Sequence, residues 1–426
     1  MNSRYESYSE TKESGVQWLG VIPRHWGVIE SKRLFAQRKE RLRLGDEHLT
    51  ASQKYGVIPQ TEFMRLEDQK VMQVFTGAEI LKHVEPNDFV ISMRSFQGGL
   101  EWCGYSGCVS SAYVGITPIK NVKPSFFKYL FKCFPYIQAL QSTSNLVRDG
   151  QALRFQNFIQ VPLPFVPEAE QSQIAKFLDY ETAKIDALIE KQQQLIAMLK
   201  EKRQAVISHA VTKGLNPDAP MRDSGVEWLG EVPAHWTVAP LKRFIVLQRG
   251  HDLPAGSRRE GGYPVVSSAG PISTHDDYRC KGPGIVTGRY GTIGEFHYVA
   301  TDFWPLNTAL YSISCHGNSE RFLLYMLRNM KHLFVLNSLK AAVPGVDRND
   351  LHCEYVAAPS NPQEQELIAN YLDDRMSRFD ELSAKTKEGI LLLQERRTAL
   401  ISNAVTGKID VRDWKAPESE TAMEVA

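Results

Sequence analysis

Two arginines stand at matching positions in the two halves of the chain, and their side chains have the chemistry to contact DNA. Arg94 follows a short apolar run at residues 89–91, and Arg289 follows a similar run at residues 285–286. Such runs are typical of buried strands, so we expect each arginine in a turn at a strand end. A guanidinium in such a turn can bond guanine bidentately or hold a phosphate. For either arginine alone a surface role is an equal alternative, but the matching positions favour DNA contact.

Other polar and cationic residues near these turns extend the predicted DNA-binding surface. Arginines in loops can follow the phosphate backbone, and a glycine-bearing turn lets the backbone approach a ligand closely. The alternative for each of these side chains is a solvated surface position. The predicted DNA-binding residues are Arg94, Gln97, Arg148, Arg154, Arg249, Arg258, Arg259, Arg289, Tyr290, Thr292 and Arg348.

The motifs of common nucleic-acid enzymes are missing from the sequence. We find no Asn-Pro-Pro-aromatic motif of amino-methyltransferases, no glycine-rich motif for a methyl donor, no Walker A loop and no PD…ExK nuclease set. The six cysteines form no CxxC pair and no histidine cluster has metal-ligand spacing, so we expect no metal site and reduced thiols. We therefore expect a chain without catalytic residues of its own.

The bulk properties are those of a globular protein with two to three domains. The chain has 426 residues, and its 50 basic and 49 acidic side chains leave a net charge of +1. This balance excludes a polybasic tail protein but allows a cationic patch on one face. The amino terminus is polar and no apolar run approaches the length of a membrane span, so we expect a cytoplasmic protein.

Two long segments must position these side chains, and each has the pattern of a long helix. Residues 167–214 run from Pro167 to Gly214 with no other proline or glycine between them, and their apolar residues recur at heptad spacing. Residues 361–407 repeat the pattern, with the pair Glu170-Gln171 recurring 194 residues later. A helix of roughly 65–70 Å, polar on most faces, is not stable alone, so we expect the two to pack as an antiparallel coiled-coil-like pair.

The seam of this predicted pair consists of apolar residues at heptad positions and of the glutamine near each helix start. These residues, which we call the helical frame, are Gln171, Ile174, Leu178, Ile185, Leu199, Val206, Gln365, Ile368, Leu372, Phe379, Leu393 and Leu400. The middle of one row is polar in both copies, at Gln192 and Thr386, and we expect these two side chains to face each other. Two unrelated amphipathic helices on separate cores are the alternative.

A second repeat opens each half of the chain. Ser14-Gly15-Val16 and Trp18-Leu19-Gly20 recur 210 residues later, followed in both copies by a proline, a histidine and a tryptophan at fixed spacing. We expect the indoles to pack against the start of a globular domain, and direct stacking on DNA is the alternative.

The two repeats predict an α+β fold with internal pseudo-two-fold symmetry, in which the two long helices separate two mixed α/β globular domains. In the first half the predicted boundaries are 1–166 for the globular domain, with its opening motif at 14–33, then 167–214 for the helix and 215–223 for a linker. In the second half they are 224–360, with its opening motif at 224–243, then 361–407, and a tail at 408–426 that we expect to be flexible.

These repeated motifs resemble those of the specificity subunit of type I restriction–modification systems. The likeness rests on the WLG-xxPxHW opening, the EQxxIAxxLD start of each long helix, and the AVxxAVTG-like end of each helix. Each motif occurs twice, and together they extend the likeness over nearly the whole chain.

The resemblance implies that each globular domain is a target recognition domain and that the long helices are a spacer between them. The two domains then recognise the two halves of a split, asymmetric site in double-stranded DNA. Two modification (methyltransferase) subunits dock on the helical frame, and restriction subunits, which are ATP-dependent translocases and endonucleases, join them. The resemblance places AdoMet in the modification subunits and ATP and Mg²⁺ in the restriction subunits, and no cofactor in this chain.

Two other functions fit the sequence pattern. One is a coiled-coil scaffold whose globular domains bind protein rather than DNA, and the other is an enzyme with a hidden active site. A sequence-selection binding assay with the methyltransferase partner present separates the scaffold from a DNA-recognition subunit. Methylation or cleavage of DNA by the purified chain alone would support the enzyme.

Overall fold

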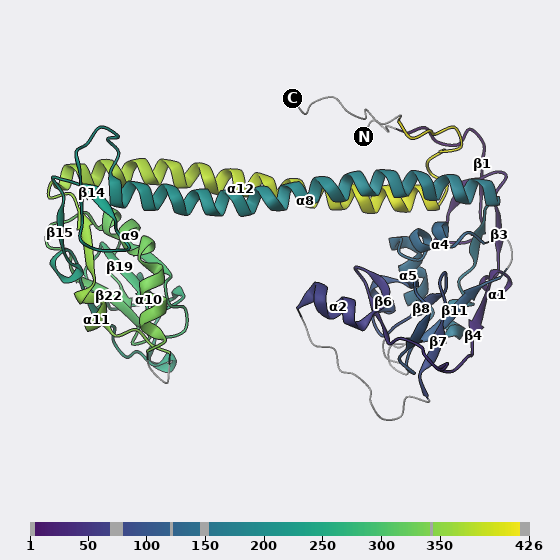
Figure 1. Ribbon diagram of the computed structural model, residues 1–426. Coiled ribbons are helices and arrows are strands. Elements are labelled where there is room, and N and C mark those ends of the chain that lie inside the picture. The colour runs from purple at the N-terminus through teal and green to yellow at the C-terminus, as the bar shows by residue number, and fades with distance from the viewer. Residues whose placement is uncertain (1–4, 69–79, 120–121, 145–152, 341–343, 418–426) are drawn as a thin grey trace. The chain divides into compact units, whose positions relative to one another are not determined.

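The computed structural model of the chain describes residues 5–68, 80–119, 122–144, 153–340 and 344–417, and Figure 1 shows its elements. The chain divides into two compact units: unit 1 comprises Met1–Lys191 and Gly389–Ala426, and unit 2 comprises Gln192–Glu388. Both predicted long helices are present, as α8 (Glu168–Lys213) and α12 (Pro362–Val405), and each contributes to both units.

Unit 1 is built around a four-stranded antiparallel sheet with the strand order β4-β11-β8-β9. The sheet consists of β4 (Phe35–Arg38), β8 (Phe89–Ile91), β9 (Glu101–Trp102) and β11 (Val114–Pro118). The two-stranded ribbons are β1 (Thr11–Glu13) with β2 (Val21–Pro23), β3 (Gly27–Ile29) with β12 (Leu163–Phe165), β5 (Leu49–Ser52) with β6 (Gly56–Pro59), and β7 (Lys82–Val84) with β10 (Gly107–Val109). The shorter helices are α1 (Ser31–Leu34), α2 (Gln60–Glu67), α3 (Ser95–Gly98), α4 (Pro124–Leu130), α5 (Phe134–Ser142) and α7 (Phe155–Phe158).

Unit 2 has a main sheet of the same design, with the strand order β16-β22-β19-β20. The sheet consists of β16 (Val246–Arg249), β19 (Gly284–Gly288), β20 (Phe296–Val299) and β22 (Ala309–Ser314). The smaller sheets are β17 (Tyr263–Ser267) with β18 (Gly270–His275) and β21 (Trp304–Pro305), β13 (Met221–Asp223) with β14 (Glu231–Pro233), and β15 (Thr237–Pro240) with β23 (Tyr355–Ala358). The shorter helices are η2 (Leu241–Arg243), η3 (Ala255–Ser257), α9 (Glu320–Asn329), α10 (Lys331–Ser338) and α11 (Arg348–Cys353).

The matching strand orders bring two strand ends to one edge of each main sheet. In unit 1 both β4 and β8 pair antiparallel with β11, and in unit 2 both β16 and β19 pair antiparallel with β22. Two strands that are antiparallel to the same neighbour run in the same direction, so they end at the same edge. Arg94 and Arg289 follow β8 and β19, which places each at this edge of its own sheet.

An aromatic core holds the main sheet of unit 1 in position. The ring of Phe35 on β4 packs edge-to-face on the rings of Phe89, Phe127 and Phe158, with centroid separations of 5.8, 5.0 and 5.8 Å. All four side chains are fully buried. Edge-to-face packing suits the ring quadrupoles and adds to the large apolar area that each ring buries. These buried rings therefore hold the sheet against α4, through Phe127, and against α7, through Phe158.

The repeated Glu-Gln pair explains why the opening motif and the long helix recur together. In unit 1 the Glu170 carboxylate accepts hydrogen bonds from Trp26 Nε1 at 3.0 Å and from Tyr8 Oη at 2.5 Å, and it lies 2.7 Å from His25 Nε2. In unit 2 the Glu364 carboxylate accepts a hydrogen bond from Trp236 Nε1 at 3.0 Å. Trp26 and Trp236 are buried, which confirms the prediction that these indoles pack in the cores.

The glutamine that follows each glutamate connects the long helix to a shorter helix, which is α4 in unit 1 and α9 in unit 2. The Gln171 side chain accepts a hydrogen bond from the backbone N–H of Lys123, which precedes α4, at 2.9 Å. The buried Gln365 side chain accepts one from the N–H of Ser319, the N-cap residue of α9, at 2.8 Å. Both amides satisfy a helix-start donor that has no partner within its own helix.

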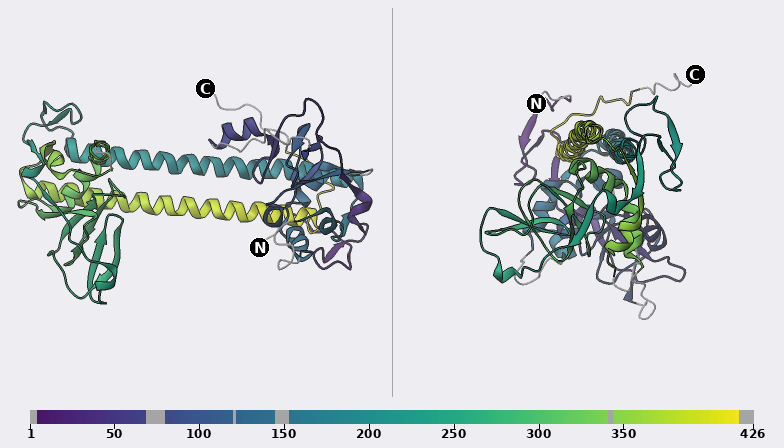
Figure 2. Two further views of the ribbon diagram at one scale, coloured as in Figure 1. Left: turned by 90° about the horizontal axis from the view of Figure 1, so that it is seen from below. Right: turned by 90° about the vertical axis from the view of Figure 1, so that its left-hand side faces the viewer.

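Within each unit the two long helices contact each other through a charged pair. In unit 1 the Arg397 guanidinium donates to both carboxylate oxygens of Asp186, at 2.8 and 3.2 Å. The parts of α8 and α12 that belong to unit 1 lie side by side in both views of Figures 1 and 2. In unit 2 Arg203 on α8 pairs with Asp380 on α12.

The charged pair of unit 2 contradicts the predicted position of the polar seam residues. Because Asp380 lies level with Arg203 and a helix rises about 1.5 Å per residue, Thr386 lies near the level of Ala197, more than one turn from Gln192. Gln192 and Thr386 therefore do not face each other. The buried Thr386 hydroxyl instead donates to the carbonyl oxygen of Leu382 on its own helix, at 2.7 Å.

The segment that follows α12 packs on unit 1 as far as Trp414. The backbone N–H of Asp410 donates to the carbonyl oxygen of Glu6 at 2.9 Å, and the Trp414 ring lies 5.3 Å from that of Phe177. Residues 418–426 of the predicted flexible tail lie outside the described residues. In the part of the chain that is described, no helix has both the length and the apolar character needed to cross a membrane.

Candidate nucleic-acid interface

Four of the predicted DNA-binding residues line one pocket in unit 2. The pocket has a volume of about 680 Å³, and we call it the arginine pocket. Arg249, Arg289, Tyr290 and Arg348 are the predicted residues in its wall. The rest of the wall consists of Gln248, Leu310, Gly345, Val346, Asp347 and Asn349.

The arginine pocket lies where β16 and β19 end at the edge of the main sheet. Arg249 is the last residue of β16, and Arg289 directly follows β19. Leu310 on β22 stands between them, paired with Arg249 on one side and with Thr287 on the other. The third arginine, Arg348, comes from the start of α11. Three segments that are distant in the sequence therefore contribute one guanidinium each.

Arg289 is held through its backbone and, unlike Arg249 and Arg348 in the described part of the chain, also by an aromatic ring. Its backbone N–H donates to the carbonyl oxygen of Thr308 at 2.9 Å, and its own carbonyl oxygen accepts from the N–H of Val346 at 2.9 Å. Its guanidinium lies over the ring of Tyr290, 4.6 Å from the centroid. A cation over an aromatic face is attracted by the ring quadrupole, so the side chain has support as well as the backbone.

The charge of the pocket is positive because its wall contains three guanidinium groups and one carboxylate, that of Asp347. The Asp347 side chain caps α11 by accepting a hydrogen bond from the N–H of Asn349 at 2.8 Å. Arg249 reaches Asp252 only at 3.9 Å, and its side chain is 52% exposed. Within the described residues neither Arg289 nor Arg348 forms an ion pair with a carboxylate. Such a pocket can receive phosphate or the acceptor edge of a base.

The other predicted residues of unit 2 lie outside the arginine pocket. The Arg258 guanidinium donates weakly to the carbonyl oxygen of Leu253 at 3.5 Å, and Arg259 forms an ion pair with Asp276 at 2.9 Å. Thr292 is exposed in the turn that follows Arg289, between β19 and β20.

Of the residues predicted in unit 1, Arg94, Gln97 and Arg154 are exposed and belong to two different short helices. Arg94 is the N-cap residue of α3 and Gln97 lies within that helix, so the turn predicted around Arg94 contains one helical turn. Arg154 is the N-cap residue of α7. Arg148 lies outside the described residues.

Gln248 and its counterpart in unit 1, Gln37, were not among the residues predicted from the sequence. Gln248-Arg249 closes β16, and Gln37-Arg38 closes β4, the strand at the same position in the other sheet. The second copy has one extra residue before this pair, since Gln248 follows Gln37 by 211 positions whereas the opening motif recurs after 210. The repeated Gln-Arg pair was the available signal, and the one-residue shift hid it from a comparison at fixed offset.

The two arginines at this position are in different electrostatic states. In unit 1 Arg38 donates to both carboxylate oxygens of Asp88, at 2.5 and 3.1 Å, and its side chain is 12% exposed. This hydrogen bond raises the pKa of the Arg38 guanidinium above its ordinary value. The positive charge of Arg38 is therefore compensated by Asp88 within its own unit. The guanidinium of Arg249 in unit 2 is available to bind an anion.

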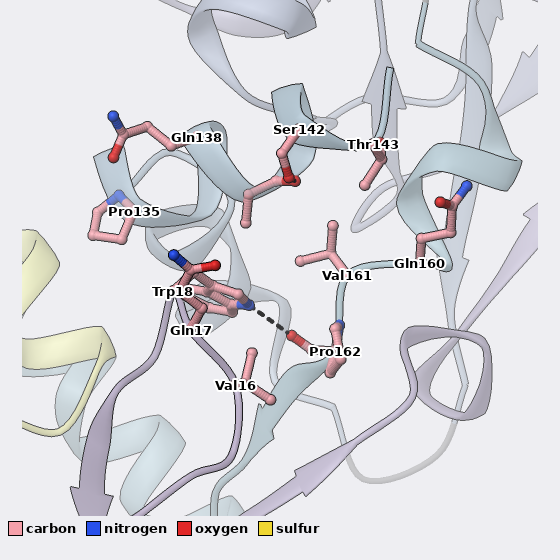
Figure 3. A pocket seen from close by; sticks show the side chains of 11 residues that line it. Val16, Gln17, Trp18, Pro135, Gln138, Ser142, Thr143, Gln160, Val161 and Pro162 are labelled. Atoms are coloured by element: carbon pink, nitrogen blue, oxygen red, sulfur yellow. Dashed lines mark hydrogen bonds between the residues drawn. The ribbon is translucent and has the colours of Figure 1, made fainter. Parts of the chain in front are cut away.

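Figure 3 shows a second pocket, in unit 1, between the opening motif and α5. It has a volume of about 540 Å³, and the Trp18 indole N–H donates to the carbonyl oxygen of Pro162 at 3.1 Å in its wall. Its lining contains no charged side chain. A phosphate there would lose water without gaining a cation, so this pocket does not suit the DNA backbone.

The residues of the helical frame are turned into the units. Gln171, Ile174, Leu178, Ile185, Gln365, Ile368, Leu372 and Leu400 are buried, and Leu199, Val206, Phe379 and Leu393 are half-buried. Ile174, Leu178, Ile185 and Leu400 belong to the hydrophobic core of unit 1, and Ile368 and Leu372 belong to that of unit 2. In the ranges that the structure describes, no three His, Cys, Asp or Glu side chains gather as metal ligands would.

Comparison with known families and proteins gives consistent matches over most of the chain. Residues 23–198 and 233–392 match the family described as "Type I restriction modification DNA specificity domain". The chain is also similar to the putative type I restriction enzyme MjaX specificity subunit of Methanocaldococcus jannaschii. The two are 22% identical over an alignment of 442 positions, gaps included, that covers 92% of this chain and 96% of that protein.

Two solved structures share the fold. One comes from work on complex assembly and conformational transition of the type I R-M system, with a TM-score of 0.70, 14% identity, and coverage of 91% of this chain and 99% of that chain. The other is the HsdS subunit from Thermoanaerobacter tengcongensis, with a TM-score of 0.55, 13% identity, and coverage of 91% and 98%. At these identities the likeness concerns the fold alone.

Proposed function

This chain belongs to the family of type I restriction–modification DNA specificity proteins, and we propose that it selects the DNA site for a type I restriction–modification complex. Each globular domain recognises one half of a bipartite, asymmetric site. The chain carries out no chemistry itself, and it directs modification subunits, which carry AdoMet, to the site that they methylate. Restriction subunits, which use ATP and Mg²⁺, join the same complex.

The arginine pocket is the observation that carries this proposal. Three guanidinium groups converge on an open pocket at a sheet edge, and their charge is not cancelled by the single carboxylate in the wall. Protein–DNA recognition needs both cations that position the phosphates and donors that contact base edges. Arginine supplies both kinds of contact.

The difference between the units supports two unlike half-sites. The Gln-Arg pair closes the same strand in both sheets, but Arg38 is bound to Asp88 while Arg249 is exposed. Each base pair presents its own pattern of donors and acceptors, so two equivalent surfaces with different unpaired donors bind different bases. We therefore propose that the site is asymmetric, with one sequence for each unit.

We assign the target recognition domains to residues 1–166 and 224–360, with 215–223 as the linker. The helices α8 and α12 form an antiparallel coiled-coil-like spacer between the two domains. The charged pairs Arg397–Asp186 and Arg203–Asp380 support this pairing within each unit. The spacer length then sets the number of base pairs that are skipped between the half-sites.

Two modification subunits dock on the outer faces of the long helices. The helical frame is occupied by packing within each unit, so the docking surface consists of the apolar side chains that remain exposed. These are Leu188, Met198, Leu367, Leu382, Leu391 and Leu392, which are 44–64% exposed. Exposed apolar residues of this kind are common at surfaces that bind other proteins.

A selection from randomised DNA duplexes, with the chain and its modification subunit together, tests the proposal. We expect enrichment of two short sequences separated by a fixed number of unspecified base pairs. Enrichment of no sequence, together with capture of a protein partner by the globular domains, would instead identify a scaffold. Methylation or cleavage by the purified chain alone would contradict the non-catalytic role.

A further inference from the structure

We infer that Arg289 recognises a guanine in the half-site of unit 2, and that Arg249 and Arg348 hold the neighbouring phosphates. The inference rests on the proposed function, since it assigns roles to the residues of the arginine pocket in DNA recognition. The three arginines receive different roles because their side chains differ in how firmly they are held.

Arg289 has the fixed position that base recognition demands. Hydrogen bonds to Thr308 and from Val346, both 2.9 Å long, hold its backbone on two sides. The Tyr290 ring lies under the guanidinium, and the ring itself is in close contact with Gly345. A side chain that is already positioned loses little conformational entropy when it bonds a base edge.

Guanine is the base that fits an arginine at this position. Its major-groove edge offers two acceptors, O6 and N7, whereas adenine offers N7 beside an amino donor. A guanidinium has only donors, in a planar fork, so it can make two bonds to guanine and one to adenine. Gln248 is a further polar side chain in the wall, and it can contact the neighbouring base pair.

Arg249 and Arg348 have the properties of phosphate contacts. Arg249 is 52% exposed and only loosely paired, and Arg348 is exposed at the first position of α11. A long, exposed cation can follow a phosphate over several geometries, and such contacts contribute affinity without sequence information. The two arginines therefore supply binding strength on either side of Arg289.

Selection from a randomised duplex library by the full chain with its modification subunit tests this division. The variants are Arg289→Lys, which keeps the charge but removes the planar fork, and Arg249→Gln and Arg348→Gln. We expect Arg289→Lys to reduce the preference for guanine at one position by about 5- to 100-fold and to leave the other selected positions unchanged. Retained preference for the half-site of unit 1 shows that the variant complex is folded.

The two phosphate variants should behave in the opposite way. Arg249→Gln and Arg348→Gln should keep the guanine while affinity falls for all sequences, and the slope of log affinity against log salt should shrink by about 0.9 for each lost contact. An unchanged guanine preference in Arg289→Lys, or a uniform loss of affinity with a smaller salt slope, overturns the inference. Failure of the wild-type complex to enrich any sequence overturns the proposed function itself.

Discussion

At the scale of single residues, Glu170 and Glu364 occupy equivalent positions and bind the opening motifs of their units, but Glu170 is the more deeply buried. The Glu170 side chain is 6% exposed and its carboxylate contacts Tyr8, His25 and Trp26. The Glu364 side chain is 29% exposed. A buried carboxylate is stable only when its hydrogen bonds are complete. Glu170 therefore contributes more to its unit than Glu364 does.

Replacing Glu170 with glutamine should destabilise unit 1. The amide can accept fewer hydrogen bonds and has no charge to offer His25, so we expect a loss of about 1–3 kcal/mol in the free energy of unfolding. Urea unfolding with hydrogen exchange at the amides of unit 1 measures this loss. Glu168→Gln on the same helix turn, where the side chain is 52% exposed, is the control and should change stability by less than about 0.5 kcal/mol. Equal effects of the two variants would contradict this role of Glu170.

Asp410 should give unit 1 a stability that depends on pH. Its carboxylate accepts hydrogen bonds from the Arg412 guanidinium, the shortest at 2.9 Å to Oδ1 and 2.6 Å to Oδ2, and this contact lowers the pKa of Asp410 below its ordinary value of 3.8. The folded state then binds this proton less readily than the unfolded chain, so the stabilisation is present above pH 3.8 and is lost on further acidification.

Thermal unfolding of Asp410→Asn between pH 6 and about pH 3 checks this linkage. We expect the stability difference from wild type to be constant near pH 6 and to shrink as the pH falls toward the acid end. Asp413→Asn, at an exposed position of the same segment, is the matched control. A difference that stays constant over the whole range would exclude a contribution from the Asp410 carboxylate.

At the scale of elements, the structure shows which parts of the fold were accessible from the sequence. The long helices and the buried indoles were predictable because their signals are local: heptad spacing, a proline and a glycine at the ends, and repeated tryptophans. Helix α3 was not, because four residues are too few for a periodic pattern. The Arg38–Asp88 pair joins residues 50 positions apart, and no local pattern indicates such a contact.

The sequence predicted that arginines would form the candidate site, but it did not show which of them meet in one pocket. Arg289 was predicted because it follows a short apolar run, and Arg249 because it lies in a stretch with further arginines, whereas their meeting depends on β22 lying between β16 and β19. Arg258 and Arg259 have the same residue type and lie outside the pocket. The predicted facing of Gln192 and Thr386 failed because heptad spacing does not specify how far two helices are shifted along each other, and the Arg203–Asp380 pair indicates a different register.

The loop that contains Gly345 should matter for DNA binding through its contact with Tyr290. A Cβ atom at Gly345 would lie 2.4 Å from Cε1 of the Tyr290 ring, so alanine there must displace the ring from beneath Arg289. We expect DNA affinity to fall by about 2- to 30-fold, the equivalent of a lost cation–π contact. Titration of a selected duplex with the complex measures this.

Gly256→Ala is the matched control for this substitution. Gly256 lies in the short helix η3 of unit 2, and nothing lies within 4 Å of the position that its Cβ would take. Its replacement should leave affinity unchanged. Equal affinity of the Gly345→Ala and Gly256→Ala complexes would show that Tyr290 does not support DNA binding.

At the scale of the whole molecule, the proposal makes the long helices a spacer whose length sets the gap in the DNA site. Inserting one heptad into both α8 and α12 lengthens each helix by about 10 Å and preserves the seven-residue repeat of the seam. We expect the preferred gap to lengthen, as measured by mapping methylated bases. Insertion into one helix alone should abolish methylation because the pair loses its register. An unchanged gap after the double insertion would contradict the spacer role.

The most direct test of the central claim, that the two units recognise two different DNA sequences a fixed distance apart, is a genome-wide map of methylated bases. The map is compared between cells that contain the chain and cells from which it is deleted. The account predicts a methylated motif of two unlike short sequences with a constant gap, which disappears on deletion. A contiguous or palindromic motif, or a map that deletion leaves unchanged, would contradict it.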